Sequence, residues 1–500
     1  MSATATSTVT DDPEGHLVRT VLRSPRLLRR ELVAGLVVAL ALIPEAISFS
    51  IIAGVDPRLG LFASFTMAVT IAIVGGRPAM ISAATGAVAL VVAPVALNYG
   101  VDYLIATVLL AGLFQIVLGV LGVAKLMRFV PRSVMVGFVN ALAILIFTAQ
   151  LPNLIDVPWA VYPMVALGLL IIVGMPRVTQ LVPGPLVAIV IITAIVLASG
   201  MSLPNVGDEG ALPESLPSLV IPDVPFSLDT LEIIAPYALA MALVGLLESL
   251  MTAKFVDDIT DSGSSKTREA WGQGVANIVT GAFGGMGGCA MIGQTMINVR
   301  ISGARSRLST FSAGVLLLIL VVGLGDLVAR IPMAALVAVM IMVSVGTFDW
   351  HSLRTLHSMP RSETAVMLAT VVVTVLTHNL AYGVIVGVLI ASVLFAQRVA
   401  HLARVERAVV VEDGAEVARY TVSGELFFAS SNDLYAQFHY AEDPDRVVID
   451  LTDSHIWDAS TVAALDSVTT KYGRKGKTVE IHGLNEDSTA RHERLSGNLG

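Results

Sequence analysis

GGRPAMISAATG (residues 75–86) and GGMGGCAMIGQT (residues 284–295) each interrupt a long apolar region with a glycine pair followed by small residues. Each opens a hydrophobic segment, near 83–96 and near 290–299, that is too short to cross a bilayer as one helix. The two segments occupy matching points in the two halves of the chain. Paired, broken hydrophobic segments of this kind indicate the substrate site of a transporter built from inverted repeats.

The composition is that of an integral membrane protein. The chain has 500 residues, of which 55% are hydrophobic and only 14% are charged, whereas soluble proteins average about 25% charged residues. The single cysteine, Cys289, excludes an internal disulfide and a cysteine-based metal cluster. No Walker-type phosphate loop occurs, which argues against an ATP-driven pump. No catalytic triad or metal motif is visible, so we do not expect an enzyme or a bound cofactor.

Fourteen apolar segments predict a seven-plus-seven arrangement of membrane spans. The first set covers 32–53, 58–75, 83–96, 102–122, 130–150, 159–175 and 183–200. The second set covers 232–254, 267–283, 290–299, 308–325, 327–345, 362–378 and 382–398. The third and tenth segments are the short ones, and we expect them to be half-helices. The fold class is therefore an α-helical membrane protein with a transport domain at 32–400, made of repeats at 32–200 and 232–398.

Charge in the loops gives the orientation. Residues 1–31 are polar and rich in arginine, and the loop at 201–231 has acidic residues but neither Lys nor Arg. The positive-inside rule therefore places both chain termini in the cytoplasm, and we expect the inner cell membrane as the location. An odd number of spans in each half inverts the second repeat relative to the first.

The character of the chain changes after Arg398. Strands are predicted at 417–422, 425–428, 447–451 and 478–482, and helices at 432–440 and 460–472. This alternation of strands and helices favours a small cytoplasmic α/β domain at 408–500.

The half-helices offer chemistry suited to an anion. A helix that begins in the bilayer presents unpaired backbone N–H groups and the positive end of its dipole. The small residues Ala84, Thr85 and Gly86 would let a ligand approach the first half-helix. Met291 to Gln294 hold the matching positions on the second. The alternative is that these residues only permit close helix packing.

Carboxylates inside spans are the second chemical signal. Glu45 follows Pro44 in the first span, and Glu248 lies in the middle of the eighth. Glu248 and Thr252 are four residues apart and so project from one helix face. Together with backbone carbonyls they suit Na⁺, or Glu248 could carry H⁺ instead. The alternative is that each glutamate only bonds a neighbouring backbone group. Phe49, one turn beyond Glu45, is a candidate pocket wall.

Several segments resemble the sulfate permease (SulP) family. They are ALIPEAISFSIIAGVDPRLGLFAS (41–64), GGRPAMISAATGAVAL (75–90), LVGLLESLMTAKFVDD (243–258) and GGCAMIGQTMINVRISGARSRLS (287–309). VSGELFFASSNDL (422–434) and VVIDLTDSHIWDAST (447–461) resemble its C-terminal STAS domain. The resemblance implies a dimeric carrier of sulfate, bicarbonate, chloride or dicarboxylates, with core and gate subdomains. Some members are coupled to Na⁺ or H⁺.

The resemblance also implies roles for single positions. The implied anion-binding positions are Glu45, Phe49, Thr85, Met291 and Gly293. The implied cation-binding positions are Glu248, Thr252, Ala290 and Ile292.

Three departures from the family pattern bear on substrate and regulation. Ala83 and Ala84 replace Gly and Pro of a Gly-Pro-Thr motif, and Gln294 stands where an arginine is common. Loss of a cation weakens binding of a doubly charged anion more than that of a singly charged one, which disfavours sulfate. The polar tail at 487–500 predicts that the last STAS helix is missing. Ser460 matches a STAS phosphosite region, although an N-cap role for it is favoured.

These observations predict secondary active transport of a small anion by Na⁺ or H⁺ symport. Bicarbonate or a dicarboxylate is the preferred substrate, and sulfate is a further candidate. One alternative is an uncoupled exchanger or a channel-like anion conductor. Another is a membrane-anchored STAS regulatory module, for which paired half-helices would be unnecessary. The expected partners are the anion, membrane lipid and a second copy of the chain, and no nucleic acid.

Overall fold

The computed structural model describes residues 20–125, 130–178, 183–400, 403–412 and 414–497. Two compact units emerge, residues 1–388 and residues 389–500. Most of the predicted cytoplasmic segment, namely 1–19, lies outside the described residues. The first long helix begins at Pro25, seven residues before the predicted span, because Pro25 suits the first turn of a helix.

One group of helices, the core helices, packs around α2 and α10. Its members are α2 (Pro25–Ile52), α3 (Pro57–Val74), α4 (Gly86–Tyr99), α5 (Val101–Val120), α9 (Leu228–Thr260), α10 (Lys266–Ala282), α11 (Ile292–Met296), the π-helical turn η4 (Ile297–Ile301) and α12 (Arg307–Gly323). The tightest crossing joins α5 and α10, where Gly112 and Gly274 face each other. A Cβ on Gly112 would lie 2.7 Å from the Gly274 carbonyl oxygen, so only glycine permits this approach.

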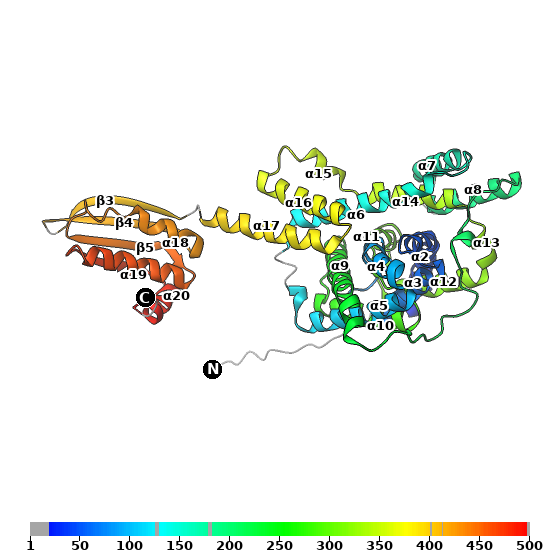
Figure 1. The fold of residues 1–500 in the computed structure, drawn as a ribbon, viewed down its shortest axis with the longest axis horizontal. Helices are drawn as coiled ribbons and strands as arrows, with labels where there is room; N and C mark the ends of the chain where they lie inside the picture. The colour runs from blue at the N-terminus through cyan, green and yellow to red at the C-terminus, as the bar shows by residue number, and fades with distance from the viewer. Residues whose placement is uncertain (1–19, 126–129, 179–182, 401–402, 413, 498–500) are drawn as a thin grey trace. The chain divides into compact units, whose positions relative to one another are not determined.

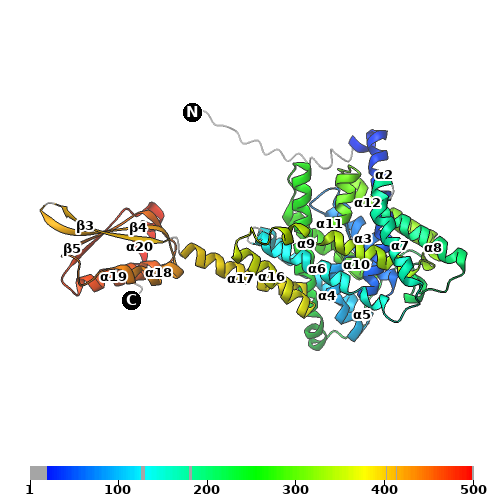
Figure 2. The same ribbon diagram turned by 90° about the horizontal axis from the view of Figure 1, so that it is seen from above.

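A second group, the gate helices, runs along one side of the core helices in Figure 1. Its members are α6 (Arg132–Thr148), α7 (Val161–Val178), α8 (Gly184–Ser199), α14 (Met333–Thr347) and α16 (Arg361–Thr377). Short helical turns connect these elements: η2 (Leu151–Leu154), η3 (Val206–Glu209), α13 (Gly325–Ala329) and α15 (Trp350–Arg354). The long helix α17 (Leu380–Ala400) follows α16. Figure 2 shows the same helices from above.

Each predicted span overlaps a helix of the described residues, and these helices occur in the predicted order. Seven of these helices are long and apolar enough to cross a membrane, and four shorter ones are also apolar. The full count of fourteen spans stays a prediction. The prediction for 327–345 is wrong at its start, where α13 ends before Pro332 and α14 begins after it. Pro332 has no N–H to continue a helix and instead sits at the N-cap.

The two broken segments meet in the middle of the core helices. β1 (Ser82–Ala83) pairs antiparallel with β2 (Cys289–Ala290), with Ser82 opposite Ala290 and Ala83 opposite Cys289. Gly288 makes this pairing possible, since a Cβ there would lie 2.0 Å from the Ala83 carbonyl oxygen. The pairing joins the two repeats at the points where their short helices begin.

Buried polar side chains hold β2 in place. Asn277 on α10 acts like a strand partner of Gly288, because its amide donates to the Gly288 carbonyl at 3.0 Å and accepts from the Gly288 N–H at 2.9 Å. Gln115 on α5 accepts a further hydrogen bond from Asn277 at 2.9 Å. Ser249 on α9 accepts from the Ala290 N–H at 3.0 Å. Unpaired backbone groups inside a membrane are costly, so these contacts compensate for breaking the helix.

The C-terminal unit is an α/β domain with the strand order β3–β4–β5–β6. Its strands are β3 (Arg404–Glu412), β4 (Ala415–Leu426), β5 (Arg446–Ile456) and β6 (Thr478–His482). β3 pairs antiparallel with β4, and the remaining pairs are parallel. The helical elements are α18 (Phe428–Leu434), η5 (Tyr435–Gln437), α19 (Ala459–Gly473) and α20 (Glu486–Leu495). Figure 1 shows α18, α19 and α20 on one side of this sheet.

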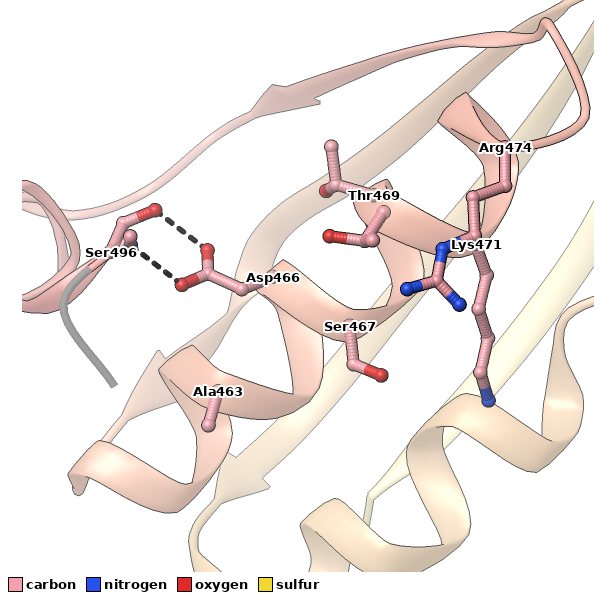
Figure 3. A pocket seen from close by; sticks show the side chains of 9 residues that line it. Ala463, Asp466, Ser467, Thr469, Lys471, Arg474 and Ser496 are labelled. Atoms are coloured by element: carbon pink, nitrogen blue, oxygen red, sulfur yellow. Dashed lines mark hydrogen bonds between the residues drawn. The ribbon is translucent and has the colours of Figure 1, made fainter. Parts of the chain in front are cut away.

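Three predictions for this unit need correction. β3 was not predicted, because six of its nine residues are exposed and four are charged, a composition typical of a linker. The helix predicted at 432–440 begins at Phe428 and gives way to η5. The tail does form a last helix, α20, and the polar composition of this helix hid it from the sequence analysis. Asp466 on α19 accepts hydrogen bonds from the Ser496 hydroxyl at 2.6 Å and the Gly497 N–H at 2.9 Å, so it fixes the end of α20 beside a surface pocket (Figure 3).

Candidate functional site

A cavity of about 90 Å³ lies between the core helices and the gate helices. Its core side is formed by Glu45, Phe49, Thr85, Gly86, Glu248, Met291, Ile292 and Gly293. Its gate side is formed by Phe138, Val139, Leu142 and Ile146 of α6 and by Val343 and Thr347 of α14. The first residues of both short helices, α4 and α11, therefore meet at one cavity.

The α4 end of the cavity is formed by the N-cap and the first residue of that helix. Thr85 is the N-cap of α4, and its hydroxyl accepts from the Val88 N–H at 3.3 Å. The N–H groups of the first turn have no partner within the helix. Gly86 keeps this turn open, since a Cβ there would lie 2.9 Å from the Phe49 ring. Phe49 therefore packs directly against the start of α4, as a pocket wall would.

Glu248 also lines the core side of this cavity. Its side chain is 6% exposed, and its Oε2 atom accepts a hydrogen bond from the Cys289 thiol at 3.1 Å. Cys289 Sγ is also 3.1 Å from the Thr85 hydroxyl. The carboxylate and the N-cap hydroxyl of α4 are thus connected through one thiol.

The second carboxylate, Glu45, is bound to the other short helix. Gln294 donates from its amide nitrogen to Glu45 Oε1 at 2.9 Å. The Gln294 side chain is 2% exposed, and its amide oxygen has no hydrogen-bond partner in the structure. Among the described residues that line the cavity, none is Lys, Arg or His. Two carboxylates therefore face one small cavity that has no fixed positive charge in its walls.

Not every predicted site residue lines the cavity. Ala84 is buried, with its N–H 3.3 Å from the Ser64 hydroxyl. Thr252 donates to the Glu248 backbone carbonyl at 2.7 Å, so it contacts the Glu248 backbone from one turn away. Ala290 is paired in the short ladder. Gln294 reaches the site only through Glu45.

Ser460 lies in the α/β unit, where it is exposed in the first turn of α19. The expected N-cap role of Ser460 is wrong, because Asp458 caps α19 by accepting from the Thr461 N–H at 3.1 Å. Phosphorylation of Ser460 stays a prediction.

The sequence analysis did not identify three groups of residues that line the cavity or support it. The gate side of the cavity, including Phe138 and Thr347, carries no motif that marks it. Asn277 and Gln115 could have been found, because polar residues inside spans are unusual and these two are fully buried. Cys289 was noted only as the single cysteine, and its contacts depend on a pairing between residues about 200 positions apart.

The paired half-helices, the ladder between the repeats and the cavity between two helix groups define a membrane transporter of the inverted-repeat class. Residues 28–161 and 156–370 match the model of the sulfate permease family, and residues 408–496 match that of the STAS domain. The chain therefore belongs to the sulfate permease family of anion transporters and carries a C-terminal STAS domain.

Known proteins of similar sequence or structure agree with this assignment. YbaR of Bacillus subtilis is 52% identical over 92% of this chain and 95% of its own length. The transmembrane domain of a cyanobacterial bicarbonate transporter, BicA, matches with a TM-score of 0.64 and 27% identity over 72% of this chain and 98% of that domain. Murine solute carrier 26 family member A9, an anion transporter solved in the inward-facing state, matches in fold with a TM-score of 0.82 at 15% identity, over 99% of this chain and 92% of that one.

Proposed function

We propose that this protein is a secondary active transporter that carries a small anion together with Na⁺ or H⁺. The observation that supports this most is the presence of Glu45 and Glu248 in one cavity whose described lining has no fixed cation. Like charges in one small cavity repel more strongly than in water, because the dielectric constant there is lower. An anion therefore enters favourably only when a cation or a proton neutralises at least one carboxylate.

The anion would bind at the α4 end of the cavity, against Thr85 and Gly86, with the first residues of α11 on its other side. The cation would bind at Glu248, with Ile292 and carbonyl groups nearby, or Glu248 would take up a proton. Thr252 and Ala290 would support this position from outside the cavity. Glu45 and Phe49 would complete the anion site.

The small volume of the cavity favours a small anion. Pockets for drug-sized ligands measure roughly 300–1,000 Å³, so a cavity of about 90 Å³ suits an ion of only a few heavy atoms. Bicarbonate fits this description better than a dicarboxylate. The likeness to a bicarbonate transporter supports the same choice. Sulfate is similarly compact, but its second charge is disfavoured without an arginine at Gln294.

Transport would proceed by alternating access. The cavity has one side on α2, α4, α9 and α11 and the other on α6 and α14, so displacement of the core helices against the gate helices would open it to either side of the membrane. We further propose that the protein is a homodimer in the inner cell membrane with both termini in the cytoplasm.

Gradient-driven uptake by the purified protein in proteoliposomes tests the coupling. We expect an imposed Na⁺ or H⁺ gradient to drive uptake of labelled bicarbonate or sulfate by the wild type, and Glu248→Gln to lose this response. The matched control is Glu232→Gln, which changes an exposed carboxylate on the same helix. Wild-type accumulation by Glu248→Gln would show that Glu248 is not the coupling group. Uptake that ignores both gradients would instead identify an uncoupled exchanger or conductor.

A further inference from the structure

Three buried groups form a continuous hydrogen-bonded chain beside the cavity. The Thr85 hydroxyl lies 3.1 Å from Cys289 Sγ, which in turn lies 3.1 Å from Glu248 Oε2. Thr85 and Glu248 both line the cavity, one at the proposed anion position and the other at the proposed cation position. Cys289 is fully buried and joins the two.

The number of hydrogens on these three groups determines which atom donates in each hydrogen bond. A thiol has one hydrogen, and an ionised carboxylate can only accept. The Cys289 hydrogen therefore goes to Glu248, and the contact between Thr85 and Cys289 takes the hydrogen of the Thr85 hydroxyl. The same hydroxyl oxygen already accepts from the Val88 N–H. In this arrangement Thr85 has no hydrogen left to donate to an anion.

We propose that Cys289 is a positioning residue that makes anion binding at Thr85 depend on cation binding at Glu248. This inference rests on the proposed symport. A cation on Glu248 satisfies the carboxylate and releases the thiol hydrogen, which turns to the Thr85 oxygen. The Thr85 hydroxyl then directs its own hydrogen into the cavity, toward the anion.

The second arrangement is fully satisfied. Thr85 accepts from the Val88 N–H and from the Cys289 thiol, which uses both lone pairs of its oxygen, and it donates once. No covalent bond changes, because only the hydroxyl and the thiol rotate. A thiol is a weak donor, so exchanging its partner costs little. By linkage, the anion must strengthen cation binding by the same factor as the cation strengthens anion binding.

Anion binding by the full-length protein, measured with and without the cation, tests this inference. Thermal stabilisation by bicarbonate is titrated in Na⁺ and in choline, and stabilisation by sulfate is titrated at two pH values for the proton case. The ratio of the two apparent dissociation constants is the coupling factor, and such factors are typically about 5–150-fold. We expect Cys289→Ala to lower it severalfold by tightening anion binding in the absence of cation, so that only the coupling through the charge of the carboxylates remains. Cys289→Ser, which keeps one hydrogen to donate, should retain coupling.

The matched control is Ser352→Ala, which removes a buried hydroxyl that accepts a hydrogen bond from Asn140 at 2.9 Å; both residues lie outside β2 and outside the cavity lining. We expect it to lower thermal stability and to leave the coupling factor unchanged. A Cys289→Ala variant that binds anion more weakly by the same factor with and without cation would show a merely structural role and overturn the inference.

A second variant covers the case in which Cys289→Ala does not fold. Thr85→Val removes the other end of this hydrogen-bonded chain, and we expect weaker anion binding together with a lower coupling factor. Full coupling in Thr85→Val would overturn the inference. A coupled wild type whose variants keep the full wild-type coupling factor would contradict only the role of Cys289, whereas an uncoupled wild type would contradict the symport itself.

Discussion

At the scale of single residues, Gln294 has the largest consequence for specificity. Its amide holds Glu45 by a neutral–ionic hydrogen bond where the family resemblance implies an arginine. An amide leaves the negative charge of Glu45 in place, whereas a guanidinium would neutralise it. The charge of the anion site is therefore set in part by this one side chain.

We predict that Gln294→Arg shifts the preference toward sulfate and weakens the cation requirement. The added charge acts on two negative charges in sulfate and on one in bicarbonate, so the ratio of sulfate to bicarbonate affinity should rise by about tenfold or more. Competition by each anion against labelled uptake measures this ratio. Gln294→Met, of similar length and uncharged, is the control. An unchanged ratio in the arginine variant would separate Gln294 from anion selectivity.

Asp443 in the STAS domain allows a prediction about pH. Burial alone would raise the pKa of its carboxyl, but hydrogen bonds from Tyr420, Tyr472 and Arg407 outweigh burial and hold the pKa below the usual 3.8. Because the folded-state pKa is lowered, these bonds contribute their full stability above the unfolded-state pKa and lose it as the pH falls through the folded-state value.

We therefore expect Asp443→Asn to lower the melting temperature of the isolated STAS domain at neutral pH and to reduce the loss of stability on acidification. Asp453→Asn, which changes an exposed carboxylate of β5, serves as the control and should behave like the wild type. Equal acid sensitivity of Asp443→Asn and the wild type would mean that other groups govern acid unfolding.

At the scale of elements, the ladder between β1 and β2 fixes the site. It joins the starts of α4 and α11, and it needs glycine at position 288, where the two backbones meet. Its support comes from side chains on three neighbouring helices rather than from the ladder itself. Small displacements of β2 are therefore expected to move Cys289 away from both of its partners.

We predict that Gly288→Ala abolishes transport and lowers thermal stability. The new methyl group would overlap the Ala83 carbonyl oxygen and force the two strands apart. Gly323→Ala in α12, where a Cβ meets nothing within 4 Å, is the matched control and should retain uptake. Uptake and melting temperature of the two purified variants decide between these outcomes, and normal uptake by Gly288→Ala would show that the ladder tolerates separation.

The helices could be predicted from the sequence because a span buries a continuous apolar run, which is visible locally. The same logic located Glu45 and Glu248, since carboxylates stand out in such runs. β3 could not be predicted because its residues are mostly exposed and include four charges, and α20 because its residues are mostly polar. The positions of both depend on neighbouring strands and helices. The contacts of Cys289 could not be predicted either, nor could the walls that α6 and α14 add to the cavity. Both depend on packing between residues that are far apart in the sequence.

At the scale of the whole molecule, two groups of helices share one small cavity with two carboxylates. Core helices supply the groups that would bind ions, and gate helices supply a wall that is apolar except for Thr347. This division of roles supports movement of one group against the other, with neutralisation of the carboxylates as the condition for carrying an anion. An uncoupled conductor or a membrane-anchored regulatory module would need neither feature.

Accumulation against a concentration gradient tests this account most directly. The full-length wild-type protein is reconstituted in proteoliposomes with equal labelled bicarbonate on both sides, in alkaline buffer so that little CO₂ crosses the lipid, and an inward Na⁺ or H⁺ gradient is imposed. The account predicts that the interior concentration rises above the exterior one and returns to equality when an ionophore collapses the gradient. Concentrations of bicarbonate, and of sulfate in a parallel experiment, that stay equal under both gradients would contradict it.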